Sequence, residues 1–216
     1  MEKNTPTTEQ VDMSEDIIAK ARANKKSIVW GSIAAAVVLI GIFVWIMVAQ
    51  AGSRKADELV AKADAAQTDS IALALYTQAA DAGYKSGNRA AAEAGIRLYR
   101  DGKYEEALKY LGKASLDDEV AAAGVYTLEG DCNVNLEKYD AALKCYDKAI
   151  SKADENPEVV PFILIKKANV YRAQGKFADE AKAYKEIIDE YPSYVAGTRT
   201  DIKKYYERAL AASQAK

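Results

Sequence analysis

Three nearly identical phrases recur in the second half of this chain, and their spacing restricts the fold more than any other feature. The copies are GKYEEALKYLGKA from Gly102, EKYDAALKCYDKAI from Glu137 and GKFADEAKAYKEI from Gly175. A small residue lies 7 positions before each copy: Gly95, Gly130 and Ala168. These residues are 35 apart (95 to 130) and 38 apart (130 to 168). Periods of this size are typical of stacked helical hairpins, in which each hairpin needs its neighbour to bury its apolar side.

The repeated residues resemble the tetratricopeptide (TPR) repeat, a helix–turn–helix unit of about 34 residues. The second copy matches through Tyr126, Gly130, Tyr139, Ala142, Tyr146 and Ala149. The first matches through Gly95, Tyr104, Ala107, Leu111 and Ala114, and the third through Ala168, Tyr171, Phe177, Tyr184, Ile187 and Pro192. The resemblance implies an all-α, right-handed TPR solenoid over residues 88–192. Its small residues would let paired helices approach closely.

The third copy departs from the pattern at one position. Glu180 lies where the first two copies have Ala107 and Ala142. A buried carboxylate without a partner is costly, so we expect this helix to be rotated, with Ala181 or Ala183 turned inward instead.

Segments on both sides extend the predicted array. Residues 52–87 indicate a degenerate hairpin of helices over 56–67 and 70–84, with Thr68 among the capping residues, followed by a KSGN turn with Asn88 as the next N-cap. Residues 193–216 predict one amphipathic capping helix, because a terminal repeat needs a cover for its apolar face. The residues expected to face the array are Val195, Ile202, Tyr205 or Tyr206, and Leu210.

An uncharged stretch of 22 residues, 28–49, follows a polar tail over residues 1–27. As a helix it would be roughly 33 Å long, which matches a bilayer core of about 30 Å. Trp30 and Trp45 lie towards its ends, as interfacial aromatic residues do. We therefore predict one transmembrane helix. A cleaved signal peptide is the alternative, since Ala49 and Ala51 form an A-x-A pattern, but its apolar region would usually be shorter.

Basic residues flank this stretch unequally. Four precede it, Lys20, Arg22, Lys25 and Lys26, and three follow it, Arg54, Lys55 and Lys62. Because positive residues favour the cytoplasmic side, we expect the tail in the cytoplasm and the large C-terminal part of the chain translocated across the membrane. The reversed topology, a receptor facing the cytosol, stays open.

The TPR resemblance also implies a concave groove lined by the first helix of each repeat. Carried over to this chain, the groove residues are Ile96, Tyr99, Arg100, Thr127, Asp131, Val134, Asn135, Asn169 and Arg172. We take Tyr99, Arg100, Thr127, Asp131, Asn135, Asn169 and Arg172 as candidate partner-binding residues. Their mixed chemistry suits an extended or helical peptide, and a merely solvated face is the alternative. A clamp for a terminal carboxylate is not expected, because Ile96 and Asp131 stand where such clamps have asparagines.

Composition argues against other functions. The chain has no histidine, and its 30 basic and 32 acidic residues leave a net charge of −2, so neither a histidine-based catalytic site nor a nucleic-acid-binding surface is expected. Phosphate-binding loops and nucleophile elbows are missing, and we predict a non-enzyme without cofactor or metal. Cys132 and Cys145 are either small packing residues or an oxidised pair.

The layout of tail, single span and TPR domain resembles a family of bacterial membrane proteins similar to the ancillary subunit of the Sec translocon. That resemblance implies a location in the bacterial inner membrane, with the TPR domain in the periplasm. It also implies two protein partners, the SecYEG channel and a membrane-anchored periplasmic chaperone. It also implies a role beside newly translocated proteins. The alternative is a self-associating envelope scaffold, to which Gly31 and Ala35 would contribute as a small-xxx-small pair in the span.

Overall fold

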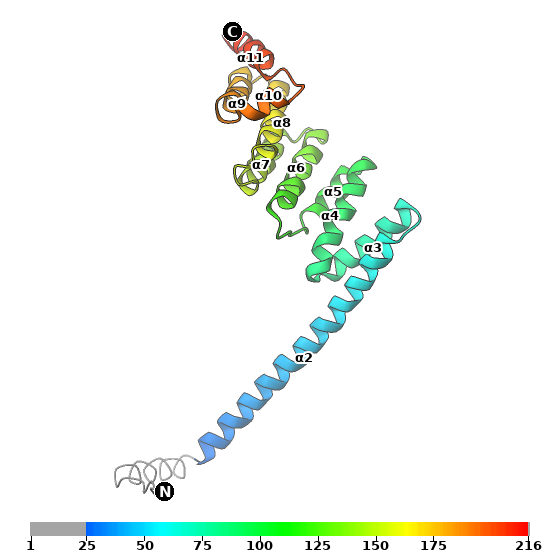
Figure 1. Cartoon of the computed structure of the whole chain (residues 1–216). Helices are drawn as coiled ribbons and strands as arrows, with labels where there is room; N and C mark the ends of the chain where they lie inside the picture. Colours follow the sequence, from blue (N-terminus) through cyan, green and yellow to red (C-terminus); the bar gives the residue numbers. More distant parts are fainter. Residues whose placement is uncertain (1–24, 216) are drawn as a thin grey trace, which may run out of the picture. The chain divides into compact units, whose positions relative to one another are not determined.

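The structure is a computed structural model that describes residues 25–215 of the chain. Every regular element in that range is an α-helix, as the sequence predicted (Figure 1). The helices, labelled as in Figure 1, are α2 (Lys25–Asp64), α3 (Asp69–Ala82), α4 (Tyr84–Arg100), α5 (Tyr104–Leu111), α6 (Glu119–Asn135), α7 (Tyr139–Lys152), α8 (Val159–Ala173), α9 (Phe177–Glu190), α10 (Pro192–Gly197) and α11 (Ile202–Gln214).

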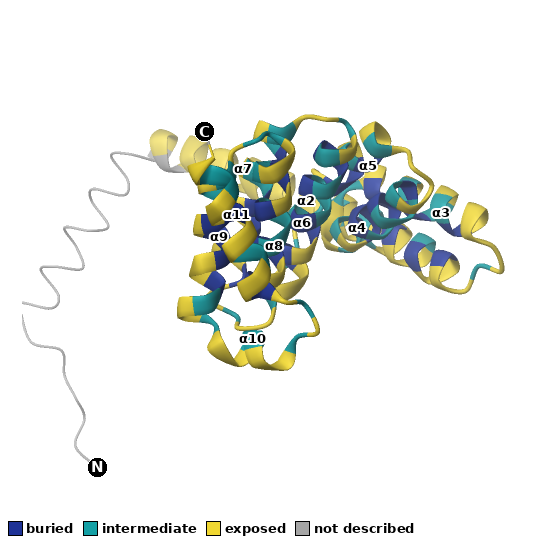
Figure 2. Cartoon of the chain, turned by 90° about the horizontal axis from the view of Figure 1, so that it is seen from above, coloured by how far each residue is buried: buried dark blue, intermediate teal, exposed yellow. Residues whose placement is uncertain are grey.

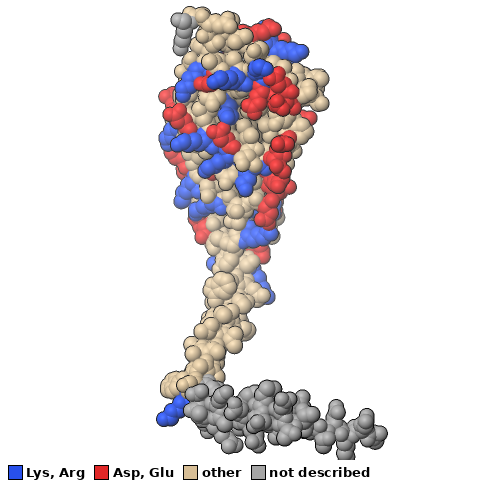
Figure 3. All heavy atoms as spheres, turned by 90° about the vertical axis from the view of Figure 1, so that its left-hand side faces the viewer, with Lys and Arg blue, Asp and Glu red and all other residues tan. Residues whose placement is uncertain are grey.

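The chain divides into two packing units after Ala51. In the first unit, residues 29–48 of α2 are all exposed, and Figure 3 shows this stretch without charged side chains. The helix is long and apolar enough to cross a membrane, by length and composition alone. The predicted tail lies outside the described residues except for 25–27, which already belong to α2. The same helix continues to Asp64, so the first helix of the predicted degenerate hairpin is its extension.

In the second unit, α4 pairs with α5, α6 with α7 and α8 with α9, which gives three successive hairpins. Buried residues lie between paired helices, and the outer faces are exposed (Figure 2). A Cβ atom on Gly130 would lie 2.3 Å from Cε1 of Tyr146, and one on Gly95 would lie 2.6 Å from the side chain of Leu111. Ala168 of the third hairpin is fully buried. The small residues therefore allow the close helix packing that the sequence predicted.

Each repeated phrase begins at the turn inside a hairpin. In the first repeat the N–H of Lys103 donates to the carbonyl of Leu98 at 2.9 Å. The equivalent bonds, each 2.8 Å long, run from Lys138 to Asn133 and from Lys176 to Tyr171. These bonds are typical of the Schellman motif at the C-terminus of a helix, in which one residue has a left-handed backbone conformation.

The left-handed residue differs between repeats. It is Gly102 (φ 74°) in the first repeat and Gly175 (φ 69°) in the third, but Glu137 (φ 57°) in the second. Glycine adopts this region without steric cost, whereas a residue with a Cβ is strained there. The shared turn explains why two of the three phrases begin with glycine.

The prediction for Glu180 was wrong. Helix α9 is not rotated: Glu180 is fully buried in the position that alanine fills in the other repeats, and Ala181 and Ala183 are buried beside it. Its Oε1 lies 2.6 Å from Nη2 of Arg208 in α11. An ion pair with the C-terminal helix thus offsets the desolvation of the carboxylate, and the sequence pattern of the repeat did not reveal this partner.

Helix α3 begins as predicted. Thr68 is its N-cap, and its Oγ1 accepts a hydrogen bond from the backbone N–H of Ile71 at 3.3 Å. Val60 and Ala63 of α2 pack in one buried cluster with Tyr76 of α3. The last part of α2 therefore packs within the second unit.

The predicted turn before the first repeat was wrong. Asn88 is no N-cap but lies inside α4, which begins at Tyr84 after a turn at Gly83 (φ 78°). Gly87 serves helix packing instead, since a Cβ there would lie 2.9 Å from the carbonyl oxygen of Ala79 in α3. A glycine that permits close approach was mistaken for a glycine that makes a turn.

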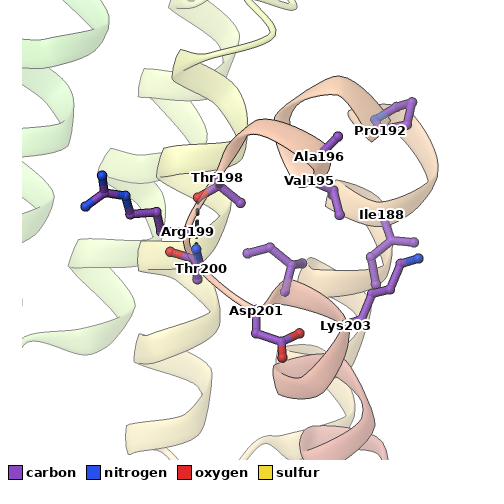
Figure 4. A pocket seen from close by; sticks show the side chains of 10 residues that line it. Ile188, Pro192, Val195, Ala196, Thr198, Arg199, Thr200, Asp201 and Lys203 are labelled. Atoms are coloured by element: carbon purple, nitrogen blue, oxygen red, sulfur yellow. Dashed lines mark hydrogen bonds between the residues drawn. The ribbon is translucent and has the colours of Figure 1, made fainter.

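The C-terminal cap consists of two helices, α10 and α11, where one was predicted. The chain leaves the helical conformation over residues 198–201, where Oγ1 of Thr198 accepts a hydrogen bond from the N–H of Thr200 at 3.2 Å (Figure 4). Asp201 then caps α11 by accepting from the N–H of Lys204. Ile202 is buried as predicted, but Leu210 is 37% exposed, and Ala209 is the buried residue at that end.

Candidate functional site

The first helices of the three repeats line a cavity of about 680 Å³, which we call the α4–α6–α8 groove. Its walls come from α4, α6 and α8, with one residue of α5 and one of the following loop. The larger apolar side chains that line it are Ile96, Leu111, Leu116, Val120, Val125, Leu128, Val159 and Phe162. The groove is therefore mainly a surface for apolar groups.

Two of these side chains are unusually open to solvent. Val120 is 49% exposed and Phe162 is 50% exposed, although both lie in well-formed helices. Large apolar side chains that share an exposed concave surface mark interaction sites more often than chance placements do. The two residues are thus the best candidates for contact with a bound segment.

The predicted groove residues fall into three groups. Tyr99, Arg100, Thr127 and Asp131 line the α4–α6–α8 groove, together with Ile96. Asn169 and Val134 line a smaller adjoining cavity of about 200 Å³, which shares Asp131 and Lys166 with the groove. Asn135 and Arg172 are exposed and line neither cavity.

Asp131 connects three helices. Its carboxylate lies 2.8 Å from Nζ of Lys166 in α8 and accepts a hydrogen bond from the hydroxyl of Tyr146 in α7 at 2.7 Å. Burial, and then the neighbouring Asp131 carboxylate, raises the pKa of Tyr146, which therefore stays a protonated donor. Since its charge is matched within the protein, Asp131 fixes the shape of the groove more than it attracts a cation.

Thr127 and Asn135 use their polar atoms locally. The buried hydroxyl of Thr127 donates to the carbonyl of Ala123, and the amide of Asn135 donates to the carbonyl of Asp131, both at 2.8 Å. Such bonds to the preceding helical turn leave less capacity for a partner.

Tyr99 packs edge-on against Tyr104, with ring centroids 5.7 Å apart. Burial raises the pKa of its hydroxyl, so the group acts as a neutral hydrogen-bonding group at physiological pH. A half-buried tyrosine in the lining of a groove can contact a peptide through its ring and form a hydrogen bond through its neutral hydroxyl.

Sequence reasoning missed Val120, Phe162 and Lys166. A signal for Phe162 was present, because it lies 6 residues before Ala168, and the groove-lining residues Arg89 and Gly124 lie 6 before Gly95 and Gly130. The same repeat position therefore faces the groove three times. No such signal marks Val120, which lies ahead of the repeat in the first turn of α6.

A further cavity of about 560 Å³ lies beside α10 and the start of α11 (Figure 4). Its polar lining includes Thr198, Thr200 and Asp201, and the Thr198 hydroxyl and the Asp201 carboxylate already hold the break between the two helices. This cavity is explained by the local fold, so the α4–α6–α8 groove is the better candidate site.

The cysteines and the acidic residues of the described range are not arranged as a reactive centre. Cys132 and Cys145 are both free thiols, and burial raises the pKa of Cys132 to about 12 and also raises that of Cys145. Thiols with raised pKa values are poor nucleophiles and poor metal ligands. Within residues 25–215, no three Cys, Asp or Glu side chains are grouped as a metal site would require.

Comparisons with known proteins agree with this fold. A tetratricopeptide-repeat family model matches residues 92–157 and again residues 127–195. No curated protein sequence matches the chain. Among solved structures, a crystal structure of MamA aligns with a TM-score of 0.50 at 20% identity and covers 68% of this chain and 89% of that one. A second crystal structure of MamA has a TM-score of 0.49 at 20% identity, with 76% and 91% covered.

The similarity to the first MamA structure supports the helical fold. The family match identifies the repeats in the sequence. The matched range begins at residue 92 within α4 and continues past the end of α9, and it includes the three Schellman turns and the contacts of Gly95 and Gly130 described above. Residues 92–195 are thus tetratricopeptide repeats.

Proposed function

We propose that this chain is a membrane-anchored protein-binding module whose α4–α6–α8 groove holds a segment of a partner protein. The observation that carries the proposal is the pair of exposed apolar anchors, Val120 and Phe162, on the concave wall of a TPR array. Helical-repeat solenoids use concave surfaces of this kind to bind extended partners. Binding rather than catalysis is proposed, because Asp131 and Thr127 are engaged in bonds that shape the groove.

The proposed anchor is the apolar part of α2, residues 28–49. Its exposed side chains would be costly in water and are favourable in a bilayer. The excess of basic residues on its N-terminal side favours residues 1–27 in the cytoplasm and the TPR unit, 52–216, in the periplasm. Anchoring would raise the effective concentration of the groove beside other membrane proteins.

Within this function, we propose an accessory or chaperone-like role beside the protein-translocation machinery of the bacterial inner membrane. The support is the resemblance in layout to the ancillary subunit of the Sec translocon, together with an apolar groove suited to unfolded or partly folded chains. The proposed partners are the SecYEG-type channel and a membrane-anchored periplasmic chaperone.

The test is a crosslinked pull-down of the full-length protein in mild detergent. It is compared with two variants: Phe162→Asp, and a chain in which residues 28–49 are replaced by an unrelated transmembrane helix. Channel subunits or the chaperone should be recovered with the wild type and the helix replacement, and lost with Phe162→Asp. Recovery of the protein alone would favour the self-associating scaffold instead.

The topology has its own test. Protease added outside intact spheroplasts should digest the TPR unit if it faces the periplasm. Protection of that unit, with digestion only after lysis, would place it in the cytosol and contradict the proposed orientation.

A further inference from the structure

The charged side chains of the α4–α6–α8 groove leave one basic group uncompensated. The others have partners: Arg89 pairs with Asp64 (3.2 Å), Glu93 with Arg97 (2.6 Å) and Asp131 with Lys166 (2.8 Å). The guanidinium of Arg100 makes no ion pair or hydrogen bond with any residue in the described part of the chain, 25–215. It is exposed and lines the groove.

None of the charged residues that line the cavity beside Arg100 forms an ion pair with it, within residues 25–215. Arg100 also lines a neighbouring cavity of about 270 Å³, and the other charged residues of its lining are Arg97, Lys103, Asp69 and Asp101. Arg97 is engaged by Glu93 (2.6 Å) and Asp69 (3.7 Å), so Arg100 is the cation without an ion pair at this end of the groove, within residues 25–215. A partner that matches the groove therefore carries a negative charge at this end and apolar side chains along the rest.

We propose that the groove selects a segment in which large apolar side chains are accompanied by one acidic side chain. Val120 and Phe162 contact the apolar side chains, and Arg100 binds the carboxylate. A guanidinium suits this role, because it can donate two parallel N–H···O bonds to one carboxylate. The inference rests on the proposed function, since it names the chemistry of the segment bound in the same groove.

The test uses the full-length protein in detergent micelles and fluorescein-labelled synthetic peptides. Each peptide contains two leucines and one variable residue, which is glutamate, glutamine or lysine, and the leucine spacing is varied across the set. Fluorescence anisotropy gives the dissociation constants. Because Arg100 is exposed, we expect the glutamate peptide to bind about fivefold more tightly than its glutamine counterpart, and the lysine peptide to bind most weakly.

Substitutions in the protein show which side chains cause the preference for the glutamate peptide. Arg100→Ala should bring the glutamate and glutamine peptides to equal affinity while the glutamine peptide still binds. Arg172→Ala is the matched control, since Arg172 is an exposed arginine outside the groove, and it should keep the preference. Phe162→Asp should weaken all three peptides.

Different results would contradict this inference and the proposed function. Equal binding of the glutamate and glutamine peptides to the wild type, or a preference that survives Arg100→Ala, would overturn this inference and leave the groove intact. Binding that is indifferent to Phe162→Asp, or no binding of any peptide, would overturn the inference and the proposed function together.

Discussion

Glu180 of α9 and Arg208 of α11 form an ion pair across the end of the solenoid, with Oε1 and Nη2 2.6 Å apart. The side chain of Glu180 is 1% exposed, whereas that of Arg208 is 44% exposed. The other carboxylate oxygen, Oε2, is buried without a hydrogen-bond partner in the described part of the protein. The pair therefore ties the C-terminal helix to the last repeat, at a position where the other repeats have alanine.

Replacing Arg208 with Met should destabilise the protein by about 2–4 kcal/mol, because a buried carboxylate loses its partner. The double variant Glu180→Ala/Arg208→Met restores the alanine of the other repeats and should be more stable than Arg208→Met alone. Chemical unfolding of the full-length protein, followed by circular dichroism, gives both values. If Arg208→Met cost no more than an ordinary surface substitution, the pair would have no structural role.

Gly130→Ala should lower the free energy of unfolding by about 1–3 kcal/mol, since the new Cβ would overlap the ring of Tyr146. Gly124→Ala is the matched control in the same helix, because a Cβ there meets nothing within 4 Å. That change should be neutral or stabilise by up to about 1 kcal/mol through helix propensity. Equal effects of the two substitutions would contradict the close packing of α6 on α7.

Glu137→Gly should stabilise the second repeat by about 1 kcal/mol, because it relieves the left-handed conformation at φ 57°. Gly102→Glu introduces the opposite change at the equivalent turn, where φ is 74°, and should destabilise by a similar amount. Thermal unfolding of both variants tests the assignment. A loss of stability in Glu137→Gly would show that the turn is not strained.

Glu129 makes stability depend on pH. Burial raises the pKa of its carboxyl above the ordinary value of 4.5, and this effect exceeds the opposing attraction of Lys148. Folding therefore favours the protonated carboxyl of Glu129. The stability that this protonated form contributes is lost as the pH rises from 4.5 through the pKa of the folded protein. We expect Glu129→Gln to be more stable than the wild type at pH 7, with a difference that shrinks towards pH 4. A difference that does not change with pH would refute this role.

The local features of the fold were largely predictable. The period of the phrases, with small residues 7 positions ahead of each, predicted the hairpins because helix pairing depends on residues close in sequence. The glycines at 102 and 175 likewise reflect one backbone conformation. The same local signals misled at Asn88, because Gly87 is required by contact with α3 rather than by a turn.

Long-range relationships were not predictable from one sequence. Nothing near Glu180 points to Arg208, which is 28 residues further along the chain, so the buried carboxylate was wrongly expected to turn outward. Of the residues taken from repeat positions, Tyr99 and Arg100 line the groove, whereas Arg172 and Asn135 line neither cavity. Lys166 was missed because its importance depends on the position of Asp131 in another repeat.

The central claim is that the α4–α6–α8 groove holds a partner segment, and site-specific photo-crosslinking in native membranes tests it most directly. A photoreactive residue replaces Phe162 in one chain and Ile71 in another; these positions are 50% and 53% exposed, and Ile71 lies outside the groove. We predict discrete protein adducts from position 162 that disappear when Val120→Asp is added, and none from position 71. Adducts of equal strength from both positions, or none from position 162, would contradict the claim.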